Sequence, residues 1–196
     1  MSSRIFMVLL LVVVTSCTSV RLIEENTDEG QARYTLKKSA ISKNEFKDGD
    51  FTLWYPNGTK KLLVTYVKGL KQGKETLWDA FGMKIRETNY HMGVKDGTEI
   101  LWNTNGTKRR ETNYKNDLQD GPDITFFENG KKEKEEIYKS GLKEGKETGY
   151  DQNGNKIYEA SYSSGLKNGS EFFYENKDGS MQVIQEIKWK NGEAVP

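Results

Sequence analysis

The sequence predicts an all-β protein: a single layer of antiparallel β-hairpins in an open repeat array of about six 24-residue units. Short stretches that alternate apolar and polar residues lie between turn signals, a pattern typical of strands. A glycine recurs every 24 residues, at Gly49, Gly73, Gly97, Gly121, Gly145 and Gly169. Five positions after each glycine stands an aromatic residue: Trp54, Trp78, Trp102, Phe126, Tyr150 and Tyr174.

The composition agrees with a thin core in which rings replace aliphatic side chains. Hydrophobic residues make up 34% of the 196-residue chain, yet it contains 8 Phe, 4 Trp and 10 Tyr. The formal net charge is +1, from 30 Lys and Arg against 29 Asp and Glu. Nonspecific nucleic-acid binding needs a surplus of cations to displace counterions from phosphates, so this balance argues against nucleic acid as a partner.

The first element in chain order is a predicted signal peptide over residues 1–16. It has one cation, Arg4, an unbroken apolar run over 5–14 and then two small residues. Ten apolar residues are too few to cross about 30 Å of hydrocarbon as a helix. The next residue is the single cysteine, Cys17, and the stretch 14–17 resembles the lipobox of bacterial lipoproteins.

That resemblance implies that Cys17 is lipidated and becomes the mature N-terminus. The partner would then be a membrane, and the location the bacterial cell envelope, with the outer membrane favoured over the inner one. The alternative is an ordinary secretory leader, with Cys17 removed or left as a free thiol.

After the cysteine, residues 17–44 are expected to form a charged tether with a short strand near residues 33–36. The repeats follow over 45–192 and a tail over 193–196. The last repeat is irregular, because Trp189 and Gly192 lie three residues late, as in a capping unit. The six units are predicted at 49–72, 73–96, 97–120, 121–144, 145–168 and 169–192.

Each unit is predicted to be a β-hairpin. In four units the turn is an Asn-Gly pair, as at 57–58, and we expect positive φ at both residues; Phe81 replaces the asparagine in the second unit and Asp178 in the sixth. The Gly-Leu-Lys-x-Gly segments, as at 69–73, supply the outer turn, with the leucine filling the gap between successive hairpins. The period of two places Thr76 with Trp78 on one face and Glu75 with Leu77 on the other.

Charged residues form columns along the repeats. Carboxylates recur at Glu75, Glu99, Asp123, Glu147 and Glu171 and at Glu87, Glu111, Glu135 and Glu159. Lysines recur as their expected partners at Lys60, Lys84, Lys108, Lys132 and Lys156 and at Lys71, Lys95, Lys143 and Lys167. We expect a solvated charge ladder; the alternatives are a track for a polyanion or glycan, and a catalytic carboxylate pair. The tryptophan rings are expected to be buried and stacked, the alternative being an exposed ladder for sugar rings or a peptide.

The sequence assembles no catalytic, metal or cofactor site, so we expect a protein that is not an enzyme. His91 is the one histidine and is expected at the surface at the end of a strand. Residues 151–155 have oxygen-bearing side chains like those of a calcium loop, but they lack its closing glutamate, which favours a plain turn.

The motif Gly73-x4-Trp78-x3-Gly82-x-Lys84-x5-Tyr90-x2-Gly93-x3-Gly97, with its counterparts over most of 45–192, resembles the MORN repeat in its bacterial variant. This variant is found in YwqK-like antitoxins and in surface lipoproteins. The resemblance implies a β-hairpin solenoid that serves in binding or scaffolding.

We therefore expect a lipid-anchored envelope protein that binds a macromolecular partner, either a protein or a cell-wall glycan. An antitoxin or immunity protein is the second hypothesis, and an envelope protein that binds or acts on glycans is the third. The expected contact residues, where rings and cations mix, are Trp78, Trp102, Arg86, Arg109 and Arg110.

Overall fold

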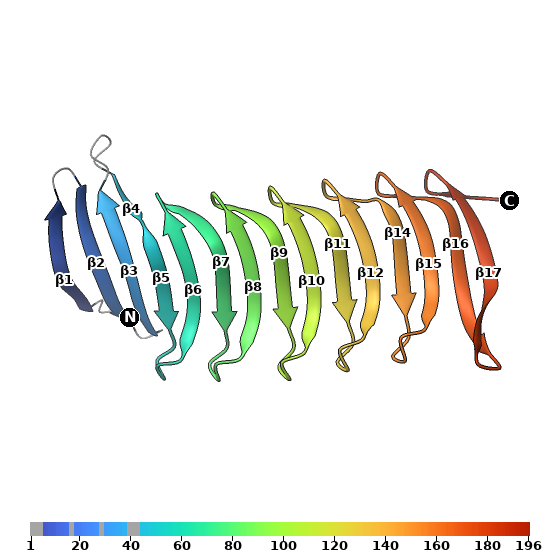
Figure 1. Ribbon diagram of the computed structural model, residues 1–196, viewed down its shortest axis with the longest axis horizontal. Helices are drawn as coiled ribbons and strands as arrows, with labels where there is room; N and C mark the ends of the chain where they lie inside the picture. Colours follow the sequence, from blue (N-terminus) through green and yellow to red (C-terminus); the bar gives the residue numbers. More distant parts are fainter. Residues whose placement is uncertain (1–5, 16–17, 28–29, 39–43) are drawn as a thin grey trace, which may run out of the picture. The chain divides into compact units, whose positions relative to one another are not determined.

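The computed structural model describes residues 6–15, 18–27, 30–38 and 44–196, which form two compact units, 1–95 and 96–196. The described residues contain strands and turns and no helix, and the strand pairings within each unit are antiparallel (Figure 1). The predicted all-β fold class, a single layer of repeated hairpins, is confirmed within each unit. No helix in this part of the chain has the length and hydrophobicity needed to span a bilayer.

In the first unit, each strand pairs with the next one along the chain, except that β4 and β5 both pair with β3. The strands are β1 (Phe6–Thr15), β2 (Thr18–Thr27), β3 (Gly30–Lys38), β4 (Glu45–Lys47), β5 (Gly49–Trp54), β6 (Lys60–Val67), β7 (Leu70–Trp78) and β8 (Lys84–His91).

In the second unit the hairpins follow the chain in the same way, and β12 pairs with both β13 and β14. The strands are β9 (Val94–Trp102), β10 (Lys108–Lys115), β11 (Leu118–Phe126), β12 (Lys132–Lys139), β13 (Leu142–Lys143), β14 (Gly145–Tyr150), β15 (Lys156–Ser163), β16 (Leu166–Lys177), β17 (Ser180–Lys190) and β18 (Glu193–Val195).

The two ends of each hairpin use different turns, and the sequence expectation for the Asn-Gly turn is wrong. Gly58 has a φ of 82°, but Asn57 is not among the residues with positive φ. The Gly58 N–H donates to Tyr55 O over 2.9 Å, and Tyr55 N donates to Thr59 O over 2.8 Å. The Asn57 side chain accepts from the N–H of Thr59, so this asparagine stabilises a longer loop that needs one left-handed residue.

The two-residue turn with positive φ at both positions is the outer turn. Lys68 and Gly69 have φ values of 49° and 83°. The leucine that follows packs on the next turn, as expected: a Cβ added to Gly93 would lie 3.3 Å from Cδ2 of Leu70. In the second unit the same approach joins Leu142 to Gly165.

Residues 18–27 and 30–38 form strands where the sequence indicated mainly a tether. Ile23 on β2 is buried and lies opposite Tyr34 on β3, and the Tyr34 ring contacts Phe51 on β5. These apolar contacts are the physical reason that the segment joins the sheet, and the short strand expected near 33–36 lies within β3.

Residues 6–14 of the predicted signal peptide's apolar run lie in β1, which pairs with β2 from Phe6 opposite Asn26 to Thr15 opposite Thr18. Cys17 lies outside the described residues, so its lipidation stays a prediction.

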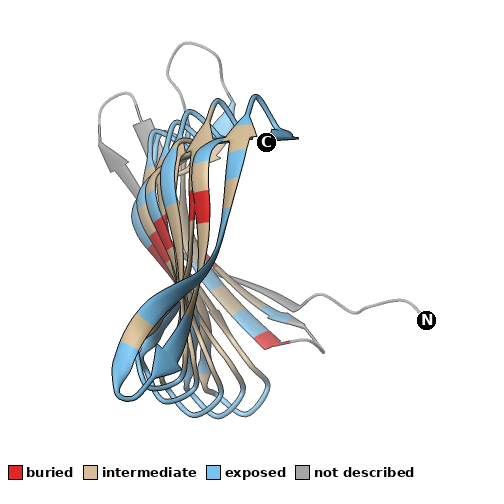
Figure 2. Ribbon diagram, turned by 90° about the vertical axis from the view of Figure 1, so that its right-hand side faces the viewer, coloured by how far each residue is buried: buried red, intermediate tan, exposed pale blue. Residues whose placement is uncertain are grey.

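A row of buried and half-buried side chains crosses the strands of each unit near their middles, and Figure 2 shows the buried positions grouped along the strands. We call it the buried row; in the first unit Thr76 and Glu87 are buried as well, on the other face. In the first unit the row begins with apolar and aromatic groups and then becomes polar: Ile23, Tyr34, Phe51, Val64, Glu75 and Thr88. In the second unit it consists mainly of carboxylates: Glu99, Thr112, Asp123, Glu136, Glu147, Ala160 and Glu171.

Candidate binding surface

Strand register sorts the side-chain columns of each unit onto two faces. On β7 and β8, Glu75 lies opposite Thr88, and Leu77 lies opposite Arg86. We call the face that carries these residues and their 24-residue equivalents the carboxylate face. The other face carries Thr76, Trp78 and Glu87 with their equivalents, and we call it the tryptophan face. The division predicted from the period of two is confirmed by this register.

The expectation of a solvated ladder is wrong for the column of carboxylates on the carboxylate face. Glu75 is 2% exposed, Asp123 is 2% exposed and Glu171 is 3% exposed. These acids therefore form much of the buried row. A buried carboxylate is costly unless cations and hydrogen-bond donors surround it.

In the first unit, Glu75 receives two cations. Lys71, four residues earlier, donates to Oε2, and Arg86 on β8 donates to Oε1 over 3.0 Å. The Lys71 ammonium also lies 4.7 Å from the centroid of the Tyr90 ring. Burial alone would lower the pKa of Lys71, but the hydrogen bond to Glu75 and the charge of that acid raise it above the ordinary value.

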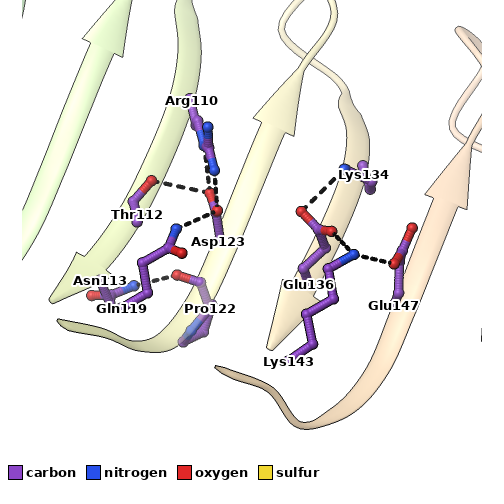
Figure 3. A network of polar contacts seen from close by, with 10 residues as sticks. All are labelled: Arg110, Thr112, Asn113, Gln119, Pro122, Asp123, Lys134, Glu136, Lys143 and Glu147. Atoms are coloured by element: carbon purple, nitrogen blue, oxygen red, sulfur yellow. Dashed lines mark hydrogen bonds and ion pairs between the residues drawn. The ribbon is translucent and has the colours of Figure 1, made fainter. Parts of the chain in front are cut away.

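In the second unit, Asp123 is surrounded by donors from three neighbouring positions (Figure 3). Arg110 binds it with two nitrogens, of which Nε lies 2.8 Å from Oδ1. Thr112 and Gln119 each donate over 3.0 Å. The hydrogen bond to Asp123 raises the pKa of the Arg110 guanidinium above its ordinary value.

Glu136 lies directly opposite Asp123, so two buried acids are neighbours across β11 and β12. Lys134 approaches Glu136 within 3.1 Å, and Lys143 bridges Glu136 and Glu147, with 2.7 Å to the latter (Figure 3). Burial lowers the pKa of Lys143, but its hydrogen bonds to the two acids outweigh this and raise it. The repulsion expected between facing acids is thereby offset by shared cations.

The last buried acid, Glu171, takes donors of three kinds. Lys167 binds it, Tyr158 donates its hydroxyl over 2.7 Å, and the indole of Trp189 donates over 2.8 Å. Burial would raise the pKa of Glu171, but these three hydrogen bonds lower it below the ordinary value. The displaced Trp189 of the irregular last repeat thus supplies a donor to the buried row.

The tryptophan face carries a second, more exposed ladder. Each glutamate there pairs with a lysine three residues earlier, at 2.9 Å for Lys84 and Glu87 and 2.6 Å for Lys108 and Glu111. The pairs Lys132–Glu135 and Lys156–Glu159 repeat this at 2.8 and 2.9 Å. The expectation that the lysine columns partner the acid columns is confirmed on both faces.

The tryptophans are less buried than the sequence predicted, and the aromatic contacts are of other kinds than a tryptophan stack. Trp54, Trp78 and Trp102 are each half-buried. Ring pairs join Tyr158 with Phe173 at 5.3 Å and Phe172 with Tyr174 at 6.3 Å. Lysine ammoniums cover several rings, as Lys156 does over Tyr174 at 4.7 Å. Contacts between cations and rings therefore hold much of the aromatic surface in place.

The five predicted contact residues do not share one face. Trp78 lies on the tryptophan face of the first unit and Arg86 on its carboxylate face. In the second unit Trp102 and Arg110 likewise lie on opposite faces, and Arg109 is exposed. The guanidiniums at 86 and 110 are engaged by buried acids. Sequence reasoning missed this, although one column gave a signal: the small residues Thr88, Thr112 and Ala160 lie opposite the acids, and only Glu136 breaks the series.

His91 is exposed, as predicted, and its Nδ1 lies 3.2 Å from Nε2 of Gln72. The loop at 151–155 is a turn, because the Asp151 carboxylate accepts from the N–H groups of Asn153 and Asn155. Across the described ranges, no group of three or more His, Cys, Asp or Glu residues is arranged to hold a metal ion.

Comparison with known families agrees with the repeat pattern. The model of the MORN repeat variant matches residues 47–68, 95–116 and 143–164. The search of curated proteins gave no match. Each matched segment begins at a lysine two residues before the repeat glycine and ends in the outer turn, and the three segments are two 24-residue periods apart. Over these three segments, the chain is similar to the MORN repeat variant.

Proposed function

We propose that this repeat protein is a binding module of the bacterial cell envelope, anchored through a lipid on Cys17 and engaging a protein partner. The similarity to MORN repeats supports a binding or scaffolding module. One observation carries the choice of a protein partner: the outer turns of the second unit present a leucine every 24 residues. Leu118, Leu142 and Leu166 are 50%, 53% and 51% exposed. Exposed apolar side chains in a regular series favour a protein surface over a glycan.

The charges of the sheet support the same choice. Arg86, Arg110 and Lys143 are committed to acids of their own unit. A polyanion or an acidic glycan would have to compete with these internal carboxylates. A partner that contacts the leucine series would not need to do so.

Affinity capture from envelope extracts, followed by identification of the retained species, tests the partner. We expect Leu118→Ser, Leu142→Ser and Leu166→Ser, combined in one chain, to abolish retention. The matched control replaces Thr104, Glu128 and Gln152, exposed at equivalent positions of the opposite loops, by serine. Retention that survives the leucine changes, or a glycan as the retained species, contradicts the proposal. Retention of a toxin encoded by a neighbouring reading frame identifies the antitoxin alternative.

Mass spectrometry of the mature N-terminus tests the anchor. Processing before Cys17 predicts a chain that starts at an acylated cysteine and lacks β1, which leaves β2 as the edge of the first sheet. A Cys17→Ser chain should then lose both the acyl mass and membrane association. A mature chain that begins elsewhere, or carries no lipid, contradicts the anchor and leaves the partner proposal standing.

A further inference from the structure

The lysines that follow the outer turns form a column whose ammonium groups share the same kind of environment. Lys71, Lys143 and Lys167 each pair with the carboxylate four residues later, at Glu75, Glu147 and Glu171. Each of these lysines also lies beside an aromatic ring at 4.7 or 4.8 Å: Tyr90, Tyr162 and Trp189 respectively. The column therefore places an ammonium between a ring and a carboxylate three times.

Lys47 occupies the same column, but the residue four positions later is Phe51. The ammonium of Lys47 lies 3.7 Å from the Phe51 ring centroid, 5.0 Å from that of Tyr34 and 5.3 Å from that of Tyr66. Rings attract a cation through their faces, but they satisfy its N–H donors poorly. The contacts that the structure shows for this ammonium are with three rings, and no carboxylate stands four residues later in the chain.

The ammonium of Lys47 is also partly shielded from solvent. Burial lowers its pKa below the ordinary value, and the positive charge of Lys71 acts in the same direction, while Glu25 opposes them. A carboxylate placed beside a partly desolvated ammonium that contacts rings would form a strong, charge-assisted hydrogen bond with it.

A pocket of about 270 Å³ opens next to this ammonium. Its walls include the charged groups of Glu25, Lys47 and Lys61 and the apolar surfaces of Tyr34, Phe51 and Leu53. Oε1 of Glu25 accepts the Tyr34 hydroxyl over 2.8 Å, so this acid is fixed by a neighbour of the lysine. The pocket is at the small end of ligand sites, which suits one compact group.

We propose that this pocket binds an organic carboxylate flanked by an amide or amine, as in an amino acid derivative or the C-terminus of a peptide. The ligand's carboxylate takes the role that glutamate plays beside the other lysines of the column. Its neighbouring N–H donates to Glu25, and its side chain contacts Leu53. This site does not depend on the leucine series proposed to bind a protein partner.

Calorimetric titration of the full chain tests the ligand class. The probes are N-acetylalanine, trialanine with a free C-terminus and trialanine amide. We expect the free acids to bind and the amide to bind at least about tenfold more weakly, because a hydrogen bond to a charged group contributes roughly that factor. The stronger of the two acids identifies a free or a peptide-borne carboxylate. No saturable binding, or equal binding of the amide, overturns the proposal.

Substitutions locate the site. Lys47→Met removes the ammonium, and Phe51→Glu supplies the internal carboxylate that the other repeats have, so both should abolish binding. Phe51→Gln removes the same ring without adding charge and should still bind. Lys71→Met, in the same column but paired with Glu75, is the control for general effects of losing a lysine and should also bind. Unchanged binding in Phe51→Glu, or equal losses in Phe51→Gln and Phe51→Glu, overturns the assignment even where Lys47→Met fails to fold.

Discussion

Asp123 and Arg110 form an asymmetric pair, because the side chain of the acid is 1% exposed and that of the arginine is 41% exposed. Removing the arginine leaves a buried charge, whereas removing the acid leaves a cation that water can reach. We predict that Arg110→Met lowers the free energy of unfolding by about 3 kcal/mol. Asp123→Asn should cost only about 1 kcal/mol, because Arg110 is then solvated.

Urea denaturation of the chain measures both changes, and Arg109→Met at an exposed neighbouring position is the control. The double variant should cost less than the sum of the single ones. If Arg110→Met has no more effect than Arg109→Met, Asp123 is not held as described.

Glu171 makes stability depend on pH in a defined direction. Its pKa is lowered in the folded chain, because the hydrogen bonds from Lys167, Tyr158 and Trp189 outweigh burial. The folded state therefore binds fewer protons than the unfolded state near the ordinary value of 4.5. This contribution is present above that value and is lost as the pH falls through the folded pKa.

We predict that the free energy of unfolding declines on acidification below pH 4.5 and that Glu171→Gln weakens this decline. Glu87 and Glu159, whose pKa values are also lowered, should sustain the remainder. Denaturant titrations from neutral to acidic pH provide the measurement. An unchanged slope in the glutamine variant would remove Glu171 from the acid response.

At the scale of elements, the packing of β3 on β5 gives a direct test of the first sheet. Gly30 has a φ of 134°, and a Cβ there would lie 2.0 Å from the carbonyl oxygen of Trp54. Gly49 has a φ of 99° with no atom near such a Cβ. We predict that Gly30→Ala costs at least about 2 kcal/mol more than Gly49→Ala, since only the first change adds a backbone clash to the strain of positive φ. Thermal melting compares them, and equal losses would show that β3 does not pack on β5.

The outer turns allow a stabilising change. Met92 has a φ of 49° and is 65% exposed, so its side chain contributes little to offset a strained backbone. Asparagine adopts this conformation readily, and we predict that Met92→Asn raises the free energy of unfolding by about 0.5 kcal/mol. Met83→Asn, at an ordinary φ, is the control and should give no gain. A loss of stability on changing Met92 would contradict the turn assignment.

Much of the element plan could be predicted from the sequence, for physical reasons. The 24-residue period defines the hairpins, and the two-residue alternation defines the faces of each strand. Together they predict which lysine pairs with each glutamate. Three features needed the structure. Asn57 uses its side chain to stabilise its loop. Residues 18–27 and 30–38 join the sheet with a few apolar contacts that a charged composition conceals.

The third feature is the burial of the carboxylates. Alternation shows that Glu75 and Asp123 share faces with Arg86 and Arg110, but not which face is buried. The two faces carry similar numbers of charges, so hydropathy does not distinguish them. The sequence alone therefore predicts a shared contact surface for the arginines and tryptophans, although residues of neighbouring strands can lie on opposite sides of the sheet.

At the scale of the whole molecule, the repeats within each unit depend on contacts with their neighbours in sequence. Arg110 of one repeat binds Asp123 of the next, and Tyr158 similarly binds Glu171. Stability in such proteins is approximately a sum over repeats and their interfaces. A complete repeat can therefore be removed if the remaining columns stay in register.

The most direct test is a pair of deletions in the second unit. Removal of residues 121–144 brings Glu147 to the place of Asp123 beside Arg110 and keeps every column aligned. Removal of residues 121–143 shifts the following strands by one position and exchanges their faces. Far-ultraviolet circular dichroism with thermal melting should show a cooperative β-sheet transition for the first chain and its loss for the second. Equal behaviour of the two chains would contradict the claim that the columns of the buried row hold the repeats together.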